Sequence, residues 1–255
     1  MKKIVLFDMD GTLTPPREKM EHRIVNSLAS LQKAGLEIGI VTGSDLNYLE
    51  EQCAALLDIG PVDITKMHFL PCNGTKYYKF VHSFKEVNSV DMVEKIGKDT
   101  YRQIIKKCMS MQLDLLESYK QLEYTGNYFD YRGSVLNRCP IGRSANPEQR
   151  KLFVDTDQKF RIRDRCISGL RINKHFQKVN VVLGGESSFD IYPHGWDKTF
   201  ALQYFNDHEV YFVGDRCEEN GNDRSIFLAC GTNGYCTNGP GQTIEIIDTI
   251  LAGIK

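Results

Sequence analysis

The stretch FDMDGTLT at residues 7–14 decides how this chain is interpreted. It closes a continuous apolar run over residues 4–7, which is typical of a strand buried on both faces of a parallel sheet. Asp8 and Asp10 follow, just past the carboxyl end of that strand, where open parallel sheets bind ligands. A carboxylate there can attack phosphorus to form an aspartyl phosphate, and a second can serve as acid and base. We therefore predict that Asp8 is the nucleophile and Asp10 its acid–base partner.

Segments typical of strands and helices alternate on both sides of this stretch. Apolar residues recur at helical spacing across residues 20–31, and residues 37–41 and 68–71 have the composition of buried strands. The same rhythm returns later, with a strand predicted over residues 209–213 and a closing helix over residues 244–254. Such alternation is typical of a parallel sheet with right-handed crossovers. We therefore predict a Rossmann-like α/β core.

The middle of the chain has a different pattern. A long helix is predicted over residues 90–119, with further helices between residues 147 and 174. Four strand-like segments lie at residues 124–132, 137–142, 178–183 and 188–192. Strands gathered with helices in this way indicate an α+β insert. We expect a core of residues 1–84 and 193–255, interrupted by an α+β cap of residues 85–192.

Composition limits the partners and the location of the protein. Hydrophobic residues make up 41% of 255 and charged residues 25%, which predicts a packed core rather than disorder. A net charge of −1 without a basic stripe argues against nucleic acid or an anionic membrane as partner. The apolar segments are too short for a membrane span or a signal peptide. The eight cysteines form no Cys-x-x-Cys pair, so we expect reduced thiols in a soluble cytoplasmic protein.

The stretch that begins at Asp8 resembles the first signature of the haloacid-dehalogenase-like (HAD) phosphotransferases. The next signatures appear in order along the chain. IVTGSD at residues 40–45 resembles the second, in which hydroxyls such as those of Thr42 and Ser44 hold phosphoryl oxygens. Lys198 resembles the third, a lysine that neutralises the phosphoryl group and the nucleophile. The resemblance implies that Thr42, Ser44 and Lys198 join the catalytic aspartates.

Acidic residues near the end of the chain complete this resemblance. Gly214-Asp215 and Asn222-Asp223 are similar to the fourth signature, whose acidic residues hold magnesium. A cation is needed because a phosphate dianion and a carboxylate repel each other, and magnesium favours oxygen ligands. The resemblance therefore implies a Mg²⁺ ion held by Asp8, Asp10, Asp215 and Asp223.

The chain is also similar, over nearly its whole length, to the eukaryotic-type phosphomannomutases. The most distinctive matching parts are YRGSVLNRCPIGRS at residues 131–144 and GGESSFDIYPHGWDK at residues 184–198. Outside them, Arg17 and Arg150 stand where that family also has arginines. The resemblance implies that six residues bind the phosphosugar: Arg17, Arg132, Arg143, Arg150, Ser188 and Asp190.

This second resemblance implies a magnesium-dependent phosphohexomutase. Such an isomerase interconverts mannose 6-phosphate and mannose 1-phosphate through an aspartyl-phosphate enzyme and a hexose 1,6-bisphosphate, on the route to GDP-mannose. Glucose phosphates are alternative substrates, and a homodimer through the cap is a further implication. Cap arginines suit this chemistry because a planar guanidinium binds phosphate bidentately, and a mutase must hold a second phosphate away from Asp8.

Two other functions remain open from the sequence. Thr42 stands where the mutases have glycine, and Cys72 stands where the family shows glutamate before Asn73-Gly74. The first departure resembles the phosphatase branches, so a HAD-type sugar-phosphate phosphatase is the main alternative. A non-enzymatic phosphosugar-binding protein is the other, and the intact Asp8, Asp10, Lys198 and Asp215 argue against it.

Overall fold

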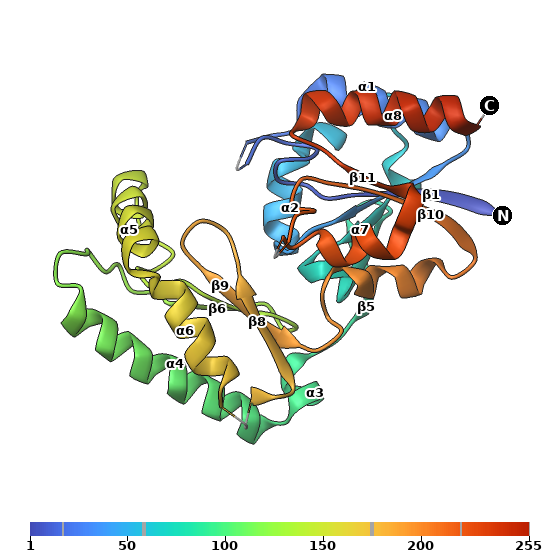
Figure 1. Cartoon of the computed structure of the whole chain (residues 1–255). Helices are drawn as coiled ribbons and strands as arrows, with labels where there is room; N and C mark the ends of the chain where they lie inside the picture. The colour runs from blue at the N-terminus through green and yellow to red at the C-terminus, as the bar shows by residue number, and fades with distance from the viewer. Residues whose placement is uncertain (17, 58–59, 174–175, 220, 255) are drawn as a thin grey trace. The chain divides into compact units, whose positions relative to one another are not determined.

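The computed structural model describes residues 1–16, 18–57, 60–173, 176–219 and 221–254. Arg17, one of the predicted phosphosugar ligands, therefore lies outside the described residues. The chain forms two compact units, a core unit of Met1–Ser89 with Gly195–Lys255 and a cap unit of Val90–His194 (Figure 1). Each unit is described by itself. Among the described residues, no helix combines the length and apolarity that a membrane span requires.

The core unit contains a seven-stranded sheet in the order β11-β10-β1-β2-β3-β4-β5. Five strands run parallel: β1 (Lys2–Phe7), β2 (Glu37–Val41), β3 (His68–Leu70), β10 (His208–Gly214) and β11 (Gly234–Cys236). The two strands at one edge, β4 (Lys76–Phe80) and β5 (Phe84–Ser89), are antiparallel. The predicted parallel α/β core is thus observed, with an antiparallel addition.

Both faces of this sheet are covered, which explains the continuous apolar run in β1. Val5 and Phe7 pack into one hydrophobic cluster, together with α1 (His22–Lys33) and α8 (Pro240–Ile254), which lie side by side (Figure 1). Ile4 and Leu6 pack on the opposite face with the 3₁₀ helix η5 (Lys198–Phe205) and α7 (Arg224–Cys230). Alternate residues of a strand point to opposite faces, so neither face of β1 tolerates a polar residue.

Shorter elements connect these layers in the core unit. They are α2 (Leu46–Gln52), η1 (Ala54–Leu56), η2 (Ile64–Lys66), η3 (Cys72–Gly74) and η6 (Gly231–Asn233). The segments that follow β1, β2 and β10 emerge at the carboxyl edge of the parallel strands, where a ligand site is expected.

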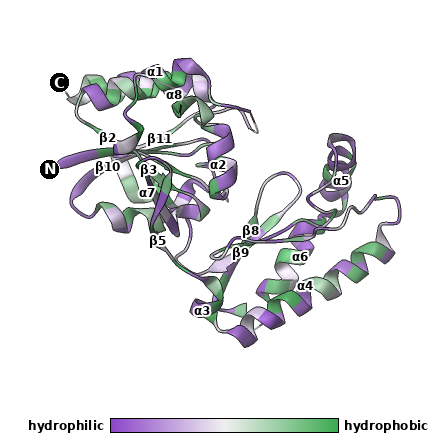
Figure 2. Cartoon of the chain, turned by 180° about the vertical axis from the view of Figure 1, so that it is seen from behind, coloured by the Kyte–Doolittle hydropathy of each residue, from purple (hydrophilic) through white to green (hydrophobic). Residues whose placement is uncertain are grey.

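The cap unit is an antiparallel sheet with helices. Its strand order is β6-β7-β9-β8, with β6 (Phe129–Tyr131), β7 (Leu136–Arg138), β8 (Val179–Leu183) and β9 (Phe189–Pro193). Its helices are α3 (Met92–Ile96), α4 (Lys98–Ser118), α5 (Pro147–Phe160) and α6 (Ile162–Arg171). Apolar and polar residues interleave along α4 (Figure 2). The helix predicted over residues 90–119 is divided at Gly97, whose φ of +88° is not helical.

The observed units differ slightly in extent from the expected domains. The expected boundary after residue 84 falls at the first residue of β5, which stays in the core sheet through its pairing with β4. The expected return at residue 193 is also early. Pro193 pairs with Val179 at the end of β9, and the next residue, His194, donates its backbone N–H to Lys178, so both remain in the cap unit.

Candidate active site

Three carboxylates gather at the carboxyl edge of the core sheet. Asp8 follows β1 and donates its backbone N–H to the carbonyl of Val213 (2.9 Å), which keeps it in line with β10. Asp215 directly follows β10, and Asp223 immediately precedes α7. One oxygen from each of Asp8, Asp215 and Asp223 lies within 4.8 Å of the others. The sequence predicted these three as metal ligands, and the structure brings them together.

Asp10, the fourth predicted ligand, is not part of this three-residue group. Its carboxylate accepts a hydrogen bond from the Tyr48 hydroxyl (2.8 Å), which belongs to α2. The tyrosine was not singled out from the sequence, because nothing in its spacing separates it from the other residues of a short amphipathic helix. The contact fixes the orientation of a carboxylate that was predicted to act as acid and base.

Lys198 is completely buried and pairs with two of the three carboxylates. Its ammonium donates to Oδ1 of Asp8 and Oδ1 of Asp223. The start of η5 is fixed because Asp197 accepts from the backbone N–H of Thr199 (2.9 Å). Burial alone would lower the pKa of Lys198, but the charges of Asp223 and Asp8 raise it above its ordinary value. The lysine is therefore a fixed positive charge beside the predicted nucleophile.

The acidic group carries more negative charge than one ammonium can balance. Burial raises the pKa of Asp8 well above its usual range, and the Asp223 charge adds to this, against the effect of Lys198. Burial, with Asp223 again contributing, raises the pKa of Asp215 to about 6. Oδ1 of Asp215 is also buried, with no hydrogen-bond partner among the described residues. A crowded anionic group with an unused buried oxygen fits a divalent cation.

Gly11 permits the close approach of two of these loops. Its φ of +80° belongs to the left-handed region, and a Cβ atom at this position would lie only 2.7 Å from the carboxylate carbon of Asp215. A side chain would therefore displace Asp215. The glycine after the two aspartates in the decisive stretch thus has a structural reason in the acidic group itself.

The two predicted hydroxyl residues lie at the end of β2. Oγ1 of Thr42 accepts the backbone N–H of Ser44 (3.1 Å), which holds this turn. The turn after β3 is bonded to it, since the N–H of Cys72 donates to the Ser44 carbonyl and the N–H of Asn73 to the Thr42 carbonyl (both 2.8 Å). Cys72 and Asn73 have left-handed φ values of 52° and 62°. Thr42 and Ser44 therefore sit on a rigid pair of turns at the same edge as Asp8.

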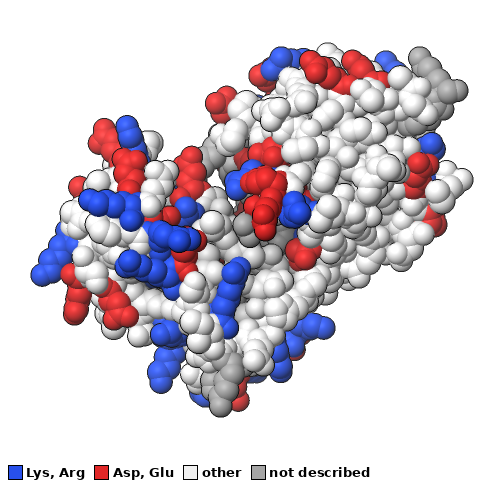
Figure 3. Space-filling model, viewed as in Figure 1, with Lys and Arg blue, Asp and Glu red and all other residues white. Residues whose placement is uncertain are grey.

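In the cap unit, two of the predicted arginines converge on Asp130. Nε of Arg132 donates to Oδ2 of Asp130 (2.9 Å), and Nη1 of Arg143 lies 3.3 Å from the same oxygen. The same nitrogen of Arg143 donates to Oδ1 of Asn137 (2.8 Å). Lys and Arg side chains gather on this unit (Figure 3). Asp130 therefore holds two guanidinium groups side by side.

Asn137 joins the arginines to the other predicted sugar ligands. Its Nδ2 donates to Oγ of Ser188 (3.0 Å) and to Oδ1 of Asp190 (2.7 Å), the residue opposite it in the β7–β9 register. Burial raises the pKa of the Asp190 carboxyl, and the charge of Arg132 opposes this. We call Asp130, Arg132, Asn137, Arg143, Ser188 and Asp190 the cap cluster. Sequence reasoning missed Asp130 in β6 and Asn137 in β7. Asp130 is two residues from the predicted Arg132, and Asn137 lies opposite the predicted Asp190.

Arg150 occupies a different position from the other cap arginines. It donates to the carbonyls of Ala145 (2.9 Å) and Arg143 (2.6 Å) and to the hydroxyl of Ser187 (2.9 Å). These contacts fasten the loop that carries Arg143 to the residue before Ser188. The structure therefore places Arg150 beside the cap cluster, with its donors directed at least in part to the protein itself.

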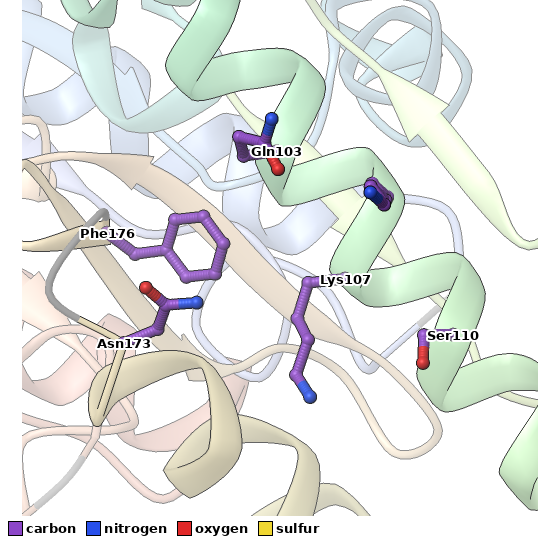
Figure 4. A pocket seen from close by; sticks show the side chains of 6 residues that line it. Gln103, Lys107, Ser110, Asn173 and Phe176 are labelled. Atoms are coloured by element: carbon purple, nitrogen blue, oxygen red, sulfur yellow. The ribbon is translucent and has the colours of Figure 1, made fainter.

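One further hollow in the cap unit lies away from all of these residues. This pocket has a volume of about 220 Å³ and lies between α4 and the segment after α6 (Figure 4). Its lining consists of Gln103, Lys106, Lys107, Ser110, Asn173 and Phe176. None of the predicted site residues contributes to it.

The fold and the acidic edge of its sheet define a HAD-like protein. A solved IMP-nucleotidase of Plasmodium falciparum, truncated at its N-terminus, matches with a TM-score of 0.64 at 16% identity, covering 98% of this chain and 70% of its own. A haloacid dehalogenase-like hydrolase from Bacteroides thetaiotaomicron matches at 0.59 and 15% identity, covering 98% and 100%. These similarities confirm the predicted fold.

The chain belongs to the eukaryotic phosphomannomutase family, whose model matches residues 24–253. A phosphomannomutase of Drosophila melanogaster is 32% identical over 97% of this chain and 95% of its own. Those of Schizosaccharomyces pombe and Encephalitozoon cuniculi are 32% and 31% identical over 98% and 99% of this chain, and over 95% of their own in both cases. The predicted family is confirmed, and with it membership of a family of isomerases.

Proposed function

We propose that this protein interconverts mannose 6-phosphate and mannose 1-phosphate, through an aspartyl-phosphate enzyme and a hexose 1,6-bisphosphate. The observation that carries the proposal is the contact of the buried Lys198 with both Asp8 and Asp223, in a chain of the phosphomannomutase family. That contact holds the nucleophile beside a fixed positive charge at the edge where such sheets bind ligands.

In the proposed cycle the phosphoryl group leaves Asp8 and returns to it. A hexose monophosphate loses a hydroxyl proton to Asp10 and attacks the aspartyl phosphate, which frees Asp8 and forms the bisphosphate. The bisphosphate reorients, Asp8 attacks its other phosphorus, and Asp10 returns the proton to the departing oxygen. Lys198 balances the charge on Asp8 and on the transferred group throughout. The hydrogen bond from Tyr48 orients Asp10 for both proton transfers.

Magnesium belongs to this proposal as the resident cation. Asp8, Asp215 and Asp223 would hold it, since their oxygens lie within 4.8 Å of one another and Oδ1 of Asp215 has no other partner among the described residues. When bound, it supplies the positive charge that lets an anionic nucleophile approach a phosphate dianion. Asp10, whose carboxylate is not part of that group, is proposed as the acid–base and remains the fourth proposed ligand.

The cap cluster is proposed to bind the sugar and its second phosphate. Arg132 and Arg143 present two guanidinium groups side by side, which suits bidentate contact with phosphate oxygens. Asp190 and Ser188 supply an acceptor and a hydroxyl for the sugar. Arg150, which holds the Arg143 loop, and Arg17, on the strength of the family resemblance, complete the proposed set.

Two wider proposals concern assembly and location. We propose a homodimer through the cap, because Met109, Leu113 and Leu116 are exposed at helical spacing along α4. Leu113→Glu should then halve the mass measured by sedimentation equilibrium, whereas an unchanged mass would exclude this face. The eight free cysteines, mostly buried, support a reducing cytoplasm as its location.

A coupled assay with mannose 1-phosphate and glucose 1-phosphate, each with and without hexose 1,6-bisphosphate, tests the function. We expect isomerisation that needs magnesium and rises with the bisphosphate, and no turnover by folded Asp8→Asn, since an amide cannot form the acyl phosphate. The alternative is a sugar-phosphate phosphatase, which the Thr42 hydroxyl favours. Release of inorganic phosphate without isomerisation, even with bisphosphate present, would establish that alternative.

A further inference from the structure

We infer that Arg163, held by Asp157, is a positioning residue that fixes the loop between β8 and β9 and thereby orients Ser188 and Asp190 toward a hexose phosphate. The inference rests on the proposed function, since it assumes that Ser188 and Asp190 bind the sugar. It adds a charged pair from α5 and α6 that touches no predicted ligand side chain and that no sequence motif indicated.

The pair is built into the junction of two helices. Asp157 is near the end of α5, and its Oδ1 accepts the backbone N–H of Arg163 (2.8 Å) in the first turn of α6. The residue at the N-cap position of α6, Arg161, makes no side-chain cap, so Asp157 satisfies an N–H that the helix leaves open. Oδ2 of Asp157 pairs with Nε of Arg163 (2.6 Å), and both side chains are largely buried. The guanidinium therefore has one fixed orientation.

The other end of that guanidinium is bonded to the hairpin loop. Nη1 of Arg163 donates to the carbonyls of Gly185 (2.8 Å) and Ser188 (3.2 Å). The Ser188 carbonyl also accepts the N–H of Gly184 (3.0 Å), which closes the loop. One nitrogen thus ties both sides of a loop that joins β8 to β9 (Figure 1).

The loop in turn determines where the proposed sugar ligands lie. A Cβ atom on Gly184 would approach Oγ of Ser188 to 2.8 Å and Oδ2 of Asp190 to 3.2 Å, so the backbone passes directly beneath both side chains. Asn137 holds the same two side chains from β7. Without Arg163 the loop would keep its own bond, the Asn137 contacts and the hydrogen bond from Arg150 to the Ser187 hydroxyl. The carbonyls of Gly185 and Ser188 would lose their link to α6, and the loop would sample other conformations.

The direct test combines hydrogen exchange with steady-state kinetics. Arg163→Gln should raise the exchange rate of the Gly184 amide about tenfold or more, since a charge-assisted bond to its acceptor is lost. KM for the hexose monophosphate should rise about tenfold, with kcat changed less than threefold, because the loop binds the sugar rather than the reacting phosphate. Arg161→Gln is the matched control, since that arginine pairs only with the exposed Asp164 among the described residues and should change neither quantity.

Two further variants keep the inference testable if Arg163→Gln does not fold. Asp157→Asn keeps an acceptor for the N–H of Arg163 but removes the charge, and should raise KM in the same direction by a smaller factor. Arg163→Lys keeps the positive charge but replaces the planar fork of donors by a single nitrogen, and should lie between wild type and Arg163→Gln.

The outcomes distinguish a failure of the positioning role of Arg163 from a failure of the proposed mutase function. Faster exchange in the loop with an unchanged KM would overturn the link to sugar binding while leaving the mutase intact. Unchanged exchange at Gly184 in a folded Arg163→Gln would overturn the positioning role itself. A wild-type protein without isomerase activity would overturn the proposed function, and the hydrogen exchange would still decide whether Arg163 holds the loop.

Discussion

Replacing Arg143 by alanine should separate the mutase from a phosphatase. Nη1 of Arg143 contacts Asn137 and Asp130, and its other guanidinium nitrogens make no hydrogen bond among the described residues, so they can bind a ligand phosphate. Losing a charged hydrogen-bond partner costs about 1.5–3 kcal/mol, which corresponds to roughly a ten- to hundredfold loss in kcat/KM for hexose phosphates. Hydrolysis of a small aryl phosphate needs no second phosphate site and should fall less than threefold.

The fold should survive this substitution. The Arg143 side chain is 38% exposed, and a partly exposed pair with Asp130 contributes at most about 1 kcal/mol to the free energy of unfolding. Arg102→Ala on α4, which removes a more exposed pair with Asp99, provides the matched control. Both activities should be measured in the same preparations of all three proteins. Equal losses of isomerisation and aryl phosphate hydrolysis in Arg143→Ala, or no loss of either, would refute the reasoning.

Three other predictions concern the metal, pH and stability. Asp215→Asn should raise the magnesium concentration needed for half-maximal activity about tenfold or more, and an unchanged titration would remove it from the ligand set. Burial and the charge of Lys79 lower the pKa of His68 to about 4, below 6.5, so the unfolded state binds the proton more tightly. The free energy of unfolding should therefore be unaffected by His68 above pH 6.5 and should fall by about 3 kcal/mol as the pH is lowered towards 4. Urea unfolding of His68→Gln should lack this loss. The buried Arg138 leaves Nε and Nη1 without a hydrogen-bond partner among the described residues. Arg138→Met should therefore raise the free energy of unfolding by about 2 kcal/mol. Gln112→Met should lower it, because it removes the one hydrogen-bond partner that Arg138 has among the described residues.

The core site was predictable because its residues follow buried strands. The apolar run before Asp8 marks β1, and the run before Asp215 marks β10, and parallel pairing of these two strands brings their carboxyl ends together. Lys198 was indicated only by family resemblance. Its contact with Asp223 in addition to Asp8 depends on how α7 and η5 pack on one face of the sheet, which no local pattern encodes.

The cap site was less predictable because β7, the strand at its centre, has no clear alternation of buried and exposed residues. Asn137 and Arg138 are adjacent, both polar and both buried, so period two cannot say which of them faces the helices. The structure turns Arg138 to Gln112 of α4 and leaves Asn137 for Ser188 and Asp190. A register shifted by one residue would exchange their positions. The central role of Asn137 in the cap cluster therefore could not be predicted without knowing how β7 pairs with its neighbouring strands.

Lys198 and Arg138, the two fully buried cationic side chains among the described residues, differ in a way that bears on function. Lys198 is paired with the predicted nucleophile Asp8 and with Asp223, so its burial preorganises positive charge where the proposed reaction needs it. Arg138 has the Gln112 amide and the Phe189 ring (5.7 Å to its centroid) as partners, and among the described residues it has no carboxylate in contact. Replacing Lys198 by methionine should therefore abolish turnover, while Arg138→Met should retain it. The comparison tests whether Lys198 has the proposed catalytic role, whereas Arg138 should affect only the stability of the fold.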